Sequence, residues 1–473
     1  MAEGLNKKEL EDLKNRLVRK PRLVWDTLSK AEKEAVFEFA EGYKAFLDRA
    51  KTEREAVQVI EEVAQKEGFK NIKKEETGRK FYRINKNKSI ALAVLGEKPL
   101  IQGLNIIAAH IDSPRLDLKQ NPLYEEVDLV FFKTHYYGGV KKYQWLARPL
   151  AIHGRIVKKD GSELDICIGE SEDDPVFTIA DLLPHLARKV QADKKMSEAI
   201  EGEKLNILVG SMPIGDDETK ERFKLGVLKY LNEVYGLVEE DLFSAEIEVV
   251  PAGKARDIGW DRSLIGAYGQ DDRVCAYATL RAICELERPG RTALALFIDK
   301  EEIGSDGSTG IKSRFTDSFL SELFEVKGEK GDERSLRDCL LSSMALSADV
   351  NGALDPDYQE VHEKRNAARI GYGVCITKFT GSGGKYGSND ANAEYLGLIR
   401  NLFNSHNVIW QAGELGKVDE GGGGTIAKFL AIYGMEILDC GTALLSMHSP
   451  FEIASKADIY MTYRGYKVFF KNL

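Results

Sequence analysis

The chain has 473 residues, of which 43% are hydrophobic and 30% are charged, and its formal net charge is -9 at pH 7. This length and composition are typical of a globular protein with two or three domains and a large buried core. The acidic balance argues against nucleic acid as the main partner, because phosphate binding requires a basic face, and the lack of any run of about 18 apolar residues argues against a membrane-spanning helix.

The cysteines and the N-terminal residues predict a cytoplasmic protein without a membrane partner. None of the six cysteines forms a C-x-x-C pair. This disfavours a thiolate metal cluster or a redox motif and favours buried free thiols in a reducing compartment. The segment from Met1 to Lys20 is charged and lacks the apolar core of a signal peptide.

The first 68 residues are predicted to be helical. Apolar residues recur at helical spacing from Ser29 to Ala50, and Thr52 with Glu55 has the capping-box pattern that begins the next helix. Short strands are then predicted at Lys80 to Ile84, Ile90 to Leu95 and Leu104 to Ala109.

The middle third, from Pro122 to Arg256, is predicted to be a mixed, strand-rich module. Short apolar segments with polar breaks indicate strands at Leu150 to Val157, Leu164 to Ile168, Asn206 to Gly210 and Ala245 to Val250. Helical spacing is found near Ile179 to Val190 and Glu218 to Tyr235.

In the last third, strands alternate with helices, which indicates an α/β domain with a largely parallel core. Helices are predicted at Gln270 to Leu286 and from Ser455 onwards. Strands are predicted at Thr292 to Ile298, Ser342 to Ala348, Ile370 to Thr380 and Glu436 to Cys440.

Histidines and carboxylates stand where these apolar strands end, which is the place where α/β folds build their sites. His110 follows the strand Leu104 to Ala109, and alternation along an extended segment places Asp112 on the same side. A carboxylate there accepts the second ring N–H of a metal-bound histidine and fixes its tautomer. A histidine after a strand is also a common structural residue, so this pair alone leaves both interpretations open.

The strongest single motif is the pair Glu301 and Glu302, which comes directly after the apolar strand Thr292 to Ile298. One carboxylate of such a pair binds a metal while the other stays free to take a proton from water. Exposed pairs of glutamates are common as well.

Asp271 and Asp272 follow a glycine, a position where acidic residues also serve as helix caps.

Asp349 and His448 complete the set, each after a further predicted strand. Two histidines and several carboxylates without cysteine suit a hard or borderline divalent metal. They are sufficient for two metals that share one bridging aspartate, with one more carboxylate left free as the base. Two neighbouring metals are a recurring solution for peptide hydrolysis.

With these motifs in place, the chain resembles the aspartyl aminopeptidase family, a group of co-catalytic zinc metallo-aminopeptidases. The resemblance implies a zinc-exopeptidase-like α/β/α catalytic domain with a central mixed sheet. The matching motifs, in the family's order, are AAHIDSPRL (Ala108 to Leu116), YYGGVKKYQWLARPLAIHGRI (Tyr136 to Ile156), LPHLA (Leu183 to Ala187), QDDR (Gln270 to Arg273), DKEEIGS (Asp299 to Ser305), SADV (Ser347 to Val350), GGGGTIAKFLA (Gly421 to Ala431) and SMHSPFE (Ser446 to Glu452). They cover the chain from about residue 80 to its end.

The resemblance implies a role for each matching site residue. Two groups of ligands are implied, one for each divalent metal: His110, Asp271 and Asp349, and Asp271, Glu302 and His448. Asp271 would thus bridge the metals, Glu301 would be the catalytic base, and Asp112 would orient His110. The metals are expected to be zinc, with cobalt and manganese as alternatives. In the wider fold the peptide bond after the bridging aspartate is often cis, so we expect this between Asp271 and Asp272.

An inserted dimerisation domain is expected between His110 and Asp271, because the 160 residues between them are too many for a loop in a compact domain. The expected division is a catalytic domain in two segments, 1–118 and 261–473, around an insert of residues 119–260. In the family, the LPHLA histidine, here His185, reaches the neighbouring subunit's active site; a packed core histidine is the alternative. Family members assemble from dimers into dodecamers, so a homo-oligomer is expected.

The segments that resemble the family's substrate-binding stretches match it less closely. Many relatives carry histidines after the aspartate of SAD, but here Asp349 is followed by VNGALDP, which indicates a divergent bacterial or archaeal-type branch. The segment GSGGKYGSN (Gly381 to Asn389) offers Lys385, which suits an acidic substrate side chain, and Tyr386. Gly423 allows close backbone approach to the substrate. Solvated or flexible loops are the alternatives.

The predicted function is removal of the N-terminal residue from peptides. The family name suggests Asp or Glu, whereas some relatives favour neutral or apolar residues. One alternative is a related two-metal hydrolase, such as a deacylase or a neighbouring aminopeptidase family, which usually lacks the YGG…W…LPHLA insert. Another is a catalytically silent self-assembling shell, which is expected to have lost the base or a ligand, whereas all are present here. The preferred residue, the native metal and the oligomer size stay open.

Overall fold

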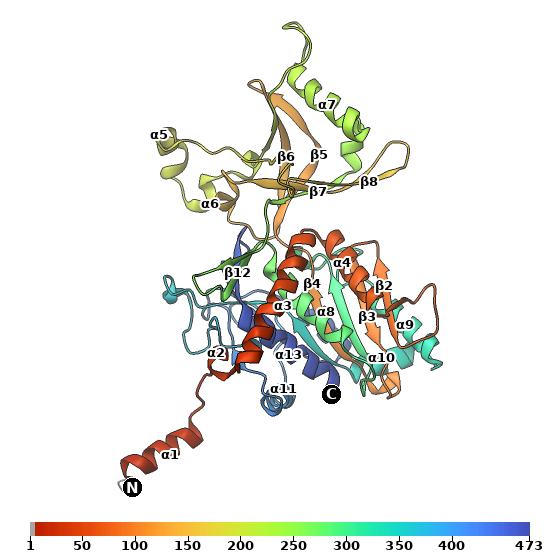
Figure 1. Cartoon of the computed structure of the whole chain (residues 1–473), viewed down its shortest axis with the longest axis vertical. Helices are drawn as coiled ribbons and strands as arrows, with labels where there is room; N and C mark the ends of the chain where they lie inside the picture. The colour runs from red at the N-terminus through yellow and green to blue at the C-terminus, as the bar shows by residue number, and fades with distance from the viewer. Residues whose placement is uncertain (1–4) are drawn as a thin grey trace.

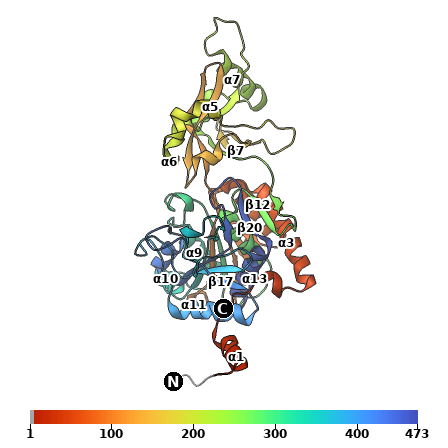
Figure 2. The same ribbon diagram turned by 90° about the vertical axis from the view of Figure 1, so that its left-hand side faces the viewer.

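The structure, a computed structural model, describes residues 5–473 and has two lobes, one above the other in Figure 1. The larger lobe holds segments from the first and last thirds of the chain, and the smaller lobe holds the middle third, as the colours in Figures 1 and 2 show. Residues 1–4, the start of the first predicted catalytic segment, lie outside the described residues.

A nine-stranded mixed sheet forms the centre of the larger lobe, in the order β1-β2-β3-β13-β4-β14-β18-β16-β17. Its strands are β1 (Lys70–Asn71), β2 (Lys80–Asn85), β3 (Ser89–Val94), β13 (Ala293–Ile298), β4 (Asn105–His110), β14 (Met344–Ala348), β18 (Glu436–Gly441), β16 (Val374–Thr377) and β17 (Trp410–Ala412). The central strands β13, β4, β14 and β18 are parallel, whereas β3 and β16 pair antiparallel with them. Every residue of β3, β4 and β13 is buried, as expected for strands covered on both faces.

Helices cover both faces of this sheet, which confirms the predicted α/β/α fold. One face packs against α3 (Lys30–Arg49), α4 (Glu53–Lys66), α8 (Gln270–Cys284), α11 (Ala393–Ser405) and α13 (Lys456–Asn472). The other packs against α9 (Phe315–Lys327), α10 (Glu333–Leu341) and α12 (Ala427–Leu430). The predicted capping box of α4 is present, since Thr52 and Glu55 each accept the other's backbone N–H with their side chains.

The register of the parallel strands brings the predicted site residues to one edge of the sheet. Ile298, at the end of β13, lies opposite His110, at the end of β4. Ala348, at the end of β14, lies opposite Ala109. The residues that follow these strands therefore emerge side by side, at the carboxyl edge where α/β sheets bind ligands.

A five-stranded sheet, ordered β11-β12-β20-β19-β15, places the remaining site residues. Its strands are β11 (Arg256–Ile258), β12 (Leu264–Ala267), β20 (Glu452–Ser455), β19 (Ala443–Leu445) and β15 (Asn351–Gly352). Asp271 lies in the first turn of α8, just after β12, and its peptide bond to Asp272 is cis, as the family resemblance implies. His448 lies between β19 and β20, one strand later than the sequence analysis predicted.

The smaller lobe is built on a six-stranded antiparallel sheet, ordered β8-β7-β10-β5-β6-β9. Its strands are β5 (Arg115–Glu126), β6 (Leu129–Tyr137), β7 (Leu150–Val157), β8 (Glu163–Ile168), β9 (Ile207–Gly210) and β10 (Glu246–Pro251). Helices α5 (Pro184–Ala187), α6 (Met196–Ala199) and α7 (Arg222–Tyr235) accompany it. The lobe has a hydrophobic core of its own. The boundaries of the insert at residues 119 and 260 stay a prediction.

The strand predicted at Ile370 to Thr380 is shorter in the structure, where only β16 forms. The N–H groups of Gly371 and Gly373 donate to the buried Asp458 carboxylate, each at 2.6 Å. These two residues are therefore hydrogen-bonded to a side chain in place of a neighbouring strand.

The helix predicted at Ile179 to Val190 is also shorter. Helix α5 begins at Pro184 and continues only as a π-helical turn, Arg188–Ala192. Proline lacks an N–H group and fits the first turn of a helix but not its interior, so the helix cannot begin earlier.

Helix α1 (Lys7–Leu17) extends away from the larger lobe in Figures 1 and 2, and none of its residues is buried. The chain returns to the larger lobe at Arg19, whose guanidinium carbon lies 3.9 Å from the centre of the Trp410 ring. The short helix α2 (Val24–Thr27) follows. Among residues 5–473, no helix is both long enough and apolar enough to cross a membrane.

Candidate metal centre

Five of the predicted site residues come together at the carboxyl edge of the central sheet. They form two overlapping groups, within each of which the ligand atoms lie within 4.8 Å of one another: His110, Asp271 and Asp349, and Asp271, Glu302 and His448. Asp271 belongs to both groups. Its Oδ1 lies 3.1 Å from His110 Nε2, and its Oδ2 lies 3.2 Å from His448 Nε2. A carboxylate that directs one oxygen to each group has the geometry of a bridging ligand.

Both histidines have one ring nitrogen held by a backbone carbonyl and the other facing the shared carboxylate. His110 Nδ1 lies 3.0 Å from the Asp112 carbonyl oxygen, and His448 Nδ1 lies 3.1 Å from the Gly139 carbonyl oxygen. Because a carbonyl only accepts, each Nδ1 carries a hydrogen, and each Nε2 is left to bind a metal through its lone pair. The Asp112 carboxylate also approaches His110 Nδ1, at 3.5 Å.

Glu301 and Glu302 lie in a 3₁₀ turn directly after β13 and differ in their surroundings. Glu302 belongs to the second ligand group, whereas Glu301 belongs to neither group and lines the adjoining cavity. The turn starts at Lys300, whose φ of 74° is unfavourable for a residue other than glycine. Asp112 stabilises the turn by accepting the backbone N–H of Glu301 at 3.1 Å and that of Glu302 at 3.2 Å.

Glu452 holds the other half of the site in the same way, a role that the sequence analysis missed. It is buried in β20 and accepts the backbone N–H of His448 at 2.8 Å and that of Asp271 at 3.1 Å. His448 has a left-handed φ of 62°, so its loop also needs such support. The signal in the sequence was an acidic residue four positions after His448, at the end of the SMHSPFE motif.

The site concentrates buried negative charge. Burial raises the pKa of the Glu302 and Asp349 carboxyls well above the usual range, and neighbouring carboxylates raise both further. Among the described residues, Glu302 Oε1 is buried without a hydrogen-bond partner. Divalent cations such as zinc prefer imidazole nitrogen and carboxylate oxygen as donors, so the residues present fit such cations.

Burial also raises the pKa of Glu301, to about 7, and the nearby Asp112 and Asp271 carboxylates add to the rise. A carboxyl group with a pKa near neutrality both takes up and releases protons readily at physiological pH. Glu301 therefore combines the pKa of a general base with a position outside both ligand groups.

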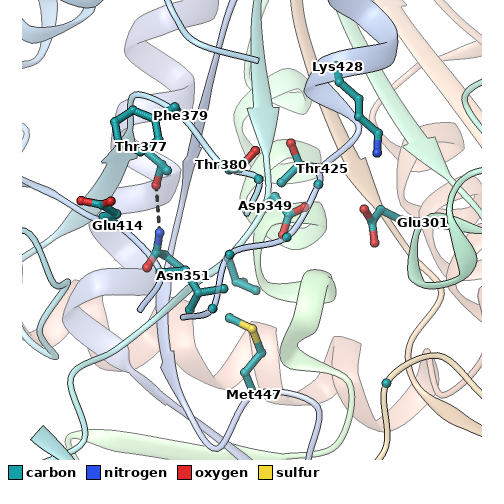
Figure 3. A pocket seen from close by; sticks show the side chains of 18 of the residues that line it. Glu301, Asp349, Asn351, Thr377, Phe379, Thr380, Glu414, Thr425, Lys428 and Met447 are labelled. Carbon is teal, nitrogen blue, oxygen red and sulfur yellow. Dashed lines mark hydrogen bonds between the residues drawn. The ribbon is translucent and has the colours of Figure 1, made fainter. Parts of the chain in front are cut away.

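A cavity of about 820 Å³ opens onto the two ligand groups, a volume that suits a small ligand or the end of a peptide. Its wall includes the two glycine-rich segments that contain Gly383 and Gly423. Figure 3 shows Glu301, Asp349 and Lys428 directed into the same space. The cavity thus brings glycine-rich backbone and a lysine side chain close to the ligand groups.

Two of the three predicted substrate-binding residues, Lys385 and Gly423, line this cavity, and Tyr386 does not. The Tyr386 side chain is 79% exposed. Lys385 is already paired, because its Nζ lies 2.7 Å from Asp390 Oδ2. The sequence analysis quoted Lys428 only as part of a motif, yet it also lines the cavity and has no salt bridge among residues 5–473.

His185 is not part of the site within one chain. It is exposed on α5 and is not among the residues that line the cavity. Figures 1 and 2 both place α5 in the smaller lobe, away from the central sheet. A catalytic role for His185 therefore requires that it come from another subunit.

The smaller lobe does reach the site through the end of β6, which the sequence analysis quoted only as part of the YYGG motif. The Tyr137 hydroxyl donates to Asp112 Oδ2 at 2.8 Å, and the Gly139 carbonyl contacts His448. A glycine pair after a tyrosine is a signal of close backbone approach, although it does not identify the partner.

Comparisons with known proteins agree with this geometry. Residues 46–470 match a family model described as Aminopeptidase I zinc metalloprotease (M18). A probable M18 family aminopeptidase 1 from Clostridium acetobutylicum is 50% identical over 465 residues, which cover 97% of this chain and 100% of that protein. The crystal structure of an M18 family aminopeptidase from Thermotoga maritima has 48% identity and a TM-score of 0.93, covering 96% of this chain and 100% of the other. The mApe1 dodecamer of S. cerevisiae shares the fold at 22% identity, with a TM-score of 0.73 and coverage of 92% and 96%.

Proposed function

The chain belongs to the M18 family of zinc metalloproteases and is an aminopeptidase, and we propose that its active centre is formed by the two ligand groups that share Asp271. One observation carries the proposal. The two oxygens of the Asp271 carboxylate face the Nε2 atoms of His110 and His448, and a carbonyl holds the Nδ1 atom of each histidine. This arrangement supports two divalent cations per subunit, with zinc as the native metal and cobalt or manganese as alternatives.

The ligands of the two cations are His110, Asp271 and Asp349 for one, and Asp271, Glu302 and His448 for the other. Cations bound there supply Lewis acidity to the scissile carbonyl and to water, and a binding point for the free amino group of the substrate. Asp112 and Glu452 keep the ligands in place, since each accepts backbone N–H groups from two residues of the site.

Glu301 is the general base. Its carboxylate lines the cavity next to both ligand groups and is free of them. It takes a proton from the water whose oxygen adds to the scissile carbonyl carbon, and it gives this proton to the leaving amine as the C–N bond breaks. The products are the free N-terminal amino acid and the shortened peptide.

The preferred N-terminal residue is Asp or Glu. Among the lysines that line the cavity, Lys385 is paired with Asp390, whereas Lys428 has no salt bridge within residues 5–473. Lys428 is only partly exposed and faces the same space as Glu301 in Figure 3. Partial desolvation strengthens its attraction for an acidic side chain. Gly423 adds backbone that a substrate can approach closely.

The insert of residues 119–260 separates the catalytic segments 1–118 and 261–473 and mediates dimerisation. Dimers assemble further into a dodecamer, as the mApe1 relative does. His185 from the neighbouring subunit stabilises the oxyanion that develops on the scissile carbonyl. Its exposed position in the smaller lobe supports a contact between subunits.

The protein acts in the cytoplasm. All six cysteines are free thiols and five of them are buried. Free thiols persist in a reducing compartment, whereas secreted proteins of this kind tend to form disulfides.

The test compares the Glu301→Gln variant with native enzyme and with Glu414→Gln, a matched control that changes another carboxylate of the same cavity. We expect Glu301→Gln to keep native metal content and thermal stability while turnover of aminoacyl chromogenic substrates falls about 10²–10⁴-fold. Full activity of Glu301→Gln would rule out its role as base. Native activity that survives complete chelation would rule out the metal centre, and hydrolysis of only N-acylated substrates would indicate a deacylase. A metal-loaded oligomer inactive on every substrate would indicate a silent shell.

A further inference from the structure

The end of β6 contacts one ligand group directly and approaches the other through Asp112, although it belongs to the smaller lobe. We call Tyr137, Gly138 and Gly139 the β6 tip. We propose that the β6 tip is a positioning element of the active site, which sets the orientation of one histidine in each ligand group. The proposal rests on the two-group metal centre described above and goes beyond it, because it makes the smaller lobe part of the catalytic site within one chain.

Tyr137 acts on the first group through Asp112. Its hydroxyl donates to Asp112 Oδ2 at 2.8 Å, shorter than the 3.2 Å contact of the same oxygen with the Glu302 backbone N–H. Asp112 is fully buried, so a lost donor cannot be replaced by bulk water. A tilt of this carboxylate moves the group that lies 3.5 Å from His110 Nδ1 and that holds the turn of Glu301 and Glu302.

The ring of Tyr137 is itself fixed by a buried arginine. The Arg115 guanidinium carbon lies 3.9 Å from the ring centre. Arg115 is held in turn by Glu53 of α4, at 3.4 Å, and by Glu248 of β10, at 3.2 Å. These two glutamates come from different lobes, so the tyrosine is clamped at the junction between them. Such a charge cluster is costly to rearrange, which suits a positioning role.

Gly138 and Gly139 act on the second group by close approach. The Gly139 carbonyl accepts from His448 Nδ1 at 3.1 Å, and a Cβ on Gly139 would lie only 3.0 Å from that nitrogen. A Cβ on Gly138 would lie 3.3 Å from Glu302 Oε2, and its φ is 71°. A side chain at either position would crowd the ligands, and at Gly138 it would also strain the backbone.

The β6 tip therefore supports both histidine ligands, by direct contact at His448 and through Asp112 at His110. Groups in this position orient metal ligands, and their loss typically lowers metal affinity or activity about 10–100-fold. Tyr137 does not line the cavity, whereas Gly139 does. For Tyr137, the expected signature is thus a loss of metal affinity and of kcat with little change in KM.

The test measures zinc affinity by competition with a chromophoric chelator, together with kcat, KM and thermal unfolding of the apo and zinc-loaded full-length protein. The variants are Tyr137→Phe, which removes one hydroxyl, and Gly139→Ala, which adds one methyl group beside His448. Tyr136→Phe is the matched control, because Tyr136 is the neighbouring residue of β6 and is 43% exposed. His110→Ala serves as the reference for a lost ligand.

We expect Tyr137→Phe and Gly139→Ala each to weaken zinc binding and lower kcat about 10–100-fold, with native apo stability. KM should stay near native in Tyr137→Phe, and Tyr136→Phe should be unchanged. Zinc affinity and kcat within twofold of native in both variants, while His110→Ala loses zinc, would overturn this inference alone. Zinc binding that is unaffected by His110→Ala would overturn both the metal centre and the inference. Equal losses in Tyr136→Phe would show a general effect of β6 and would also overturn it.

Discussion

Within the single chain, the two lobes differ in how completely their apolar residues are buried. In the larger lobe, strands β3, β4 and β13 are buried at every position. In the smaller lobe, strand β8 alternates between exposed and half-buried residues. Four apolar side chains around α5 are 41–62% exposed: Leu182, Leu183, Leu186 and Val190. Apolar surface of this kind is typical of a contact with another chain.

This difference suggests a division of tasks between the lobes. In the proposed centre, the larger lobe supplies all the ligands and the base, so one chain is sufficient to form both ligand groups. The smaller lobe orients these ligands through Tyr137 and Gly139 and carries His185 on a surface suited to a partner. Substitutions in the larger lobe should therefore change the stability and chemistry of the single chain. Substitutions in the smaller lobe should change the assembly of subunits and the orientation of the metal ligands.

The largest expected effect is on stability and compares one phenylalanine from each lobe. Phe297 is fully buried in β13, whereas Phe243 of the smaller lobe is 65% exposed. We expect Phe297→Ala to lower the free energy of unfolding by about 3–5 kcal/mol, because it leaves a cavity in a covered sheet. Phe243→Ala should change it by less than about 0.5 kcal/mol. Urea unfolding measures both, and equal losses would contradict the difference in burial.

The next effect tests whether the smaller lobe completes a neighbour's site. We expect His185→Ala to lower kcat about 10²–10³-fold, as for loss of an oxyanion donor. If His185 acts across a two-fold interface, mixing the His185→Ala protein with the Glu301→Gln protein should restore activity. In each mixed dimer, one active site then has both native Glu301 and native His185. Steady-state assays before and after subunit exchange measure this. Failure of the exchanged mixture to exceed the sum of its components would contradict action in trans.

The candidate metal ligands could be located from the sequence because most of them follow a recognisable strand. His110, Glu302 and Asp349 follow apolar segments that are long enough to be recognised as strands, and register then brings such ends together. Lone acidic pairs do not reveal which member is the ligand, so that assignment depended on the family resemblance. The parallel core could be predicted for the same reason, since buried central strands are continuously apolar.

The contacts that hold the candidate ligands in place could not be predicted from the local sequence pattern. Tyr137 and Asp112 are 25 residues apart, and Gly139 and His448 are 309 apart. The second contact uses a backbone carbonyl, which every residue has, so no residue type identifies it. The strand expected at Ile370 to Thr380 was wrong in length for a similar reason, since the carboxylate that binds its N–H groups comes from Asp458, far along the chain.

The junction between the lobes predicts a pH-dependent loss of stability. His153 of β7 lies 2.7 Å from Glu55 of α4. Burial alone lowers the pKa of His153, but its contacts with Cys167, Glu170 and Glu55 outweigh burial and raise this pKa to about 11. In the unfolded chain the pKa is about 6.5. The contribution of protonated His153 to the stability of the fold is therefore complete below pH 6.5 and is lost as pH rises towards 11.

The contribution of His153 to the free energy of unfolding is expected to be about 1–3 kcal/mol, as for a buried hydrogen bond between charged groups. Urea unfolding of native protein and of His153→Gln at pH 6 and pH 10 measures it. The difference between the two proteins should be larger at pH 6, and His135→Gln, which changes an exposed histidine of the same lobe, should behave like native. A difference independent of pH would show that His153 contributes through packing only.

The smallest expected effect concerns substrate selectivity in the larger lobe and compares two lysines of one cavity. Lys385 is paired with Asp390, and Lys428 is not paired among the described residues. We expect Lys428→Ala to lower the ratio of kcat/KM for an aspartyl over a leucyl substrate about tenfold, which corresponds to about 1.4 kcal/mol. Lys385→Ala should change this ratio less than twofold, because its charge is already neutralised. An equal loss in both variants would mean that substrate displaces Asp390 from Lys385, and no loss in either would mean that an acidic side chain binds elsewhere.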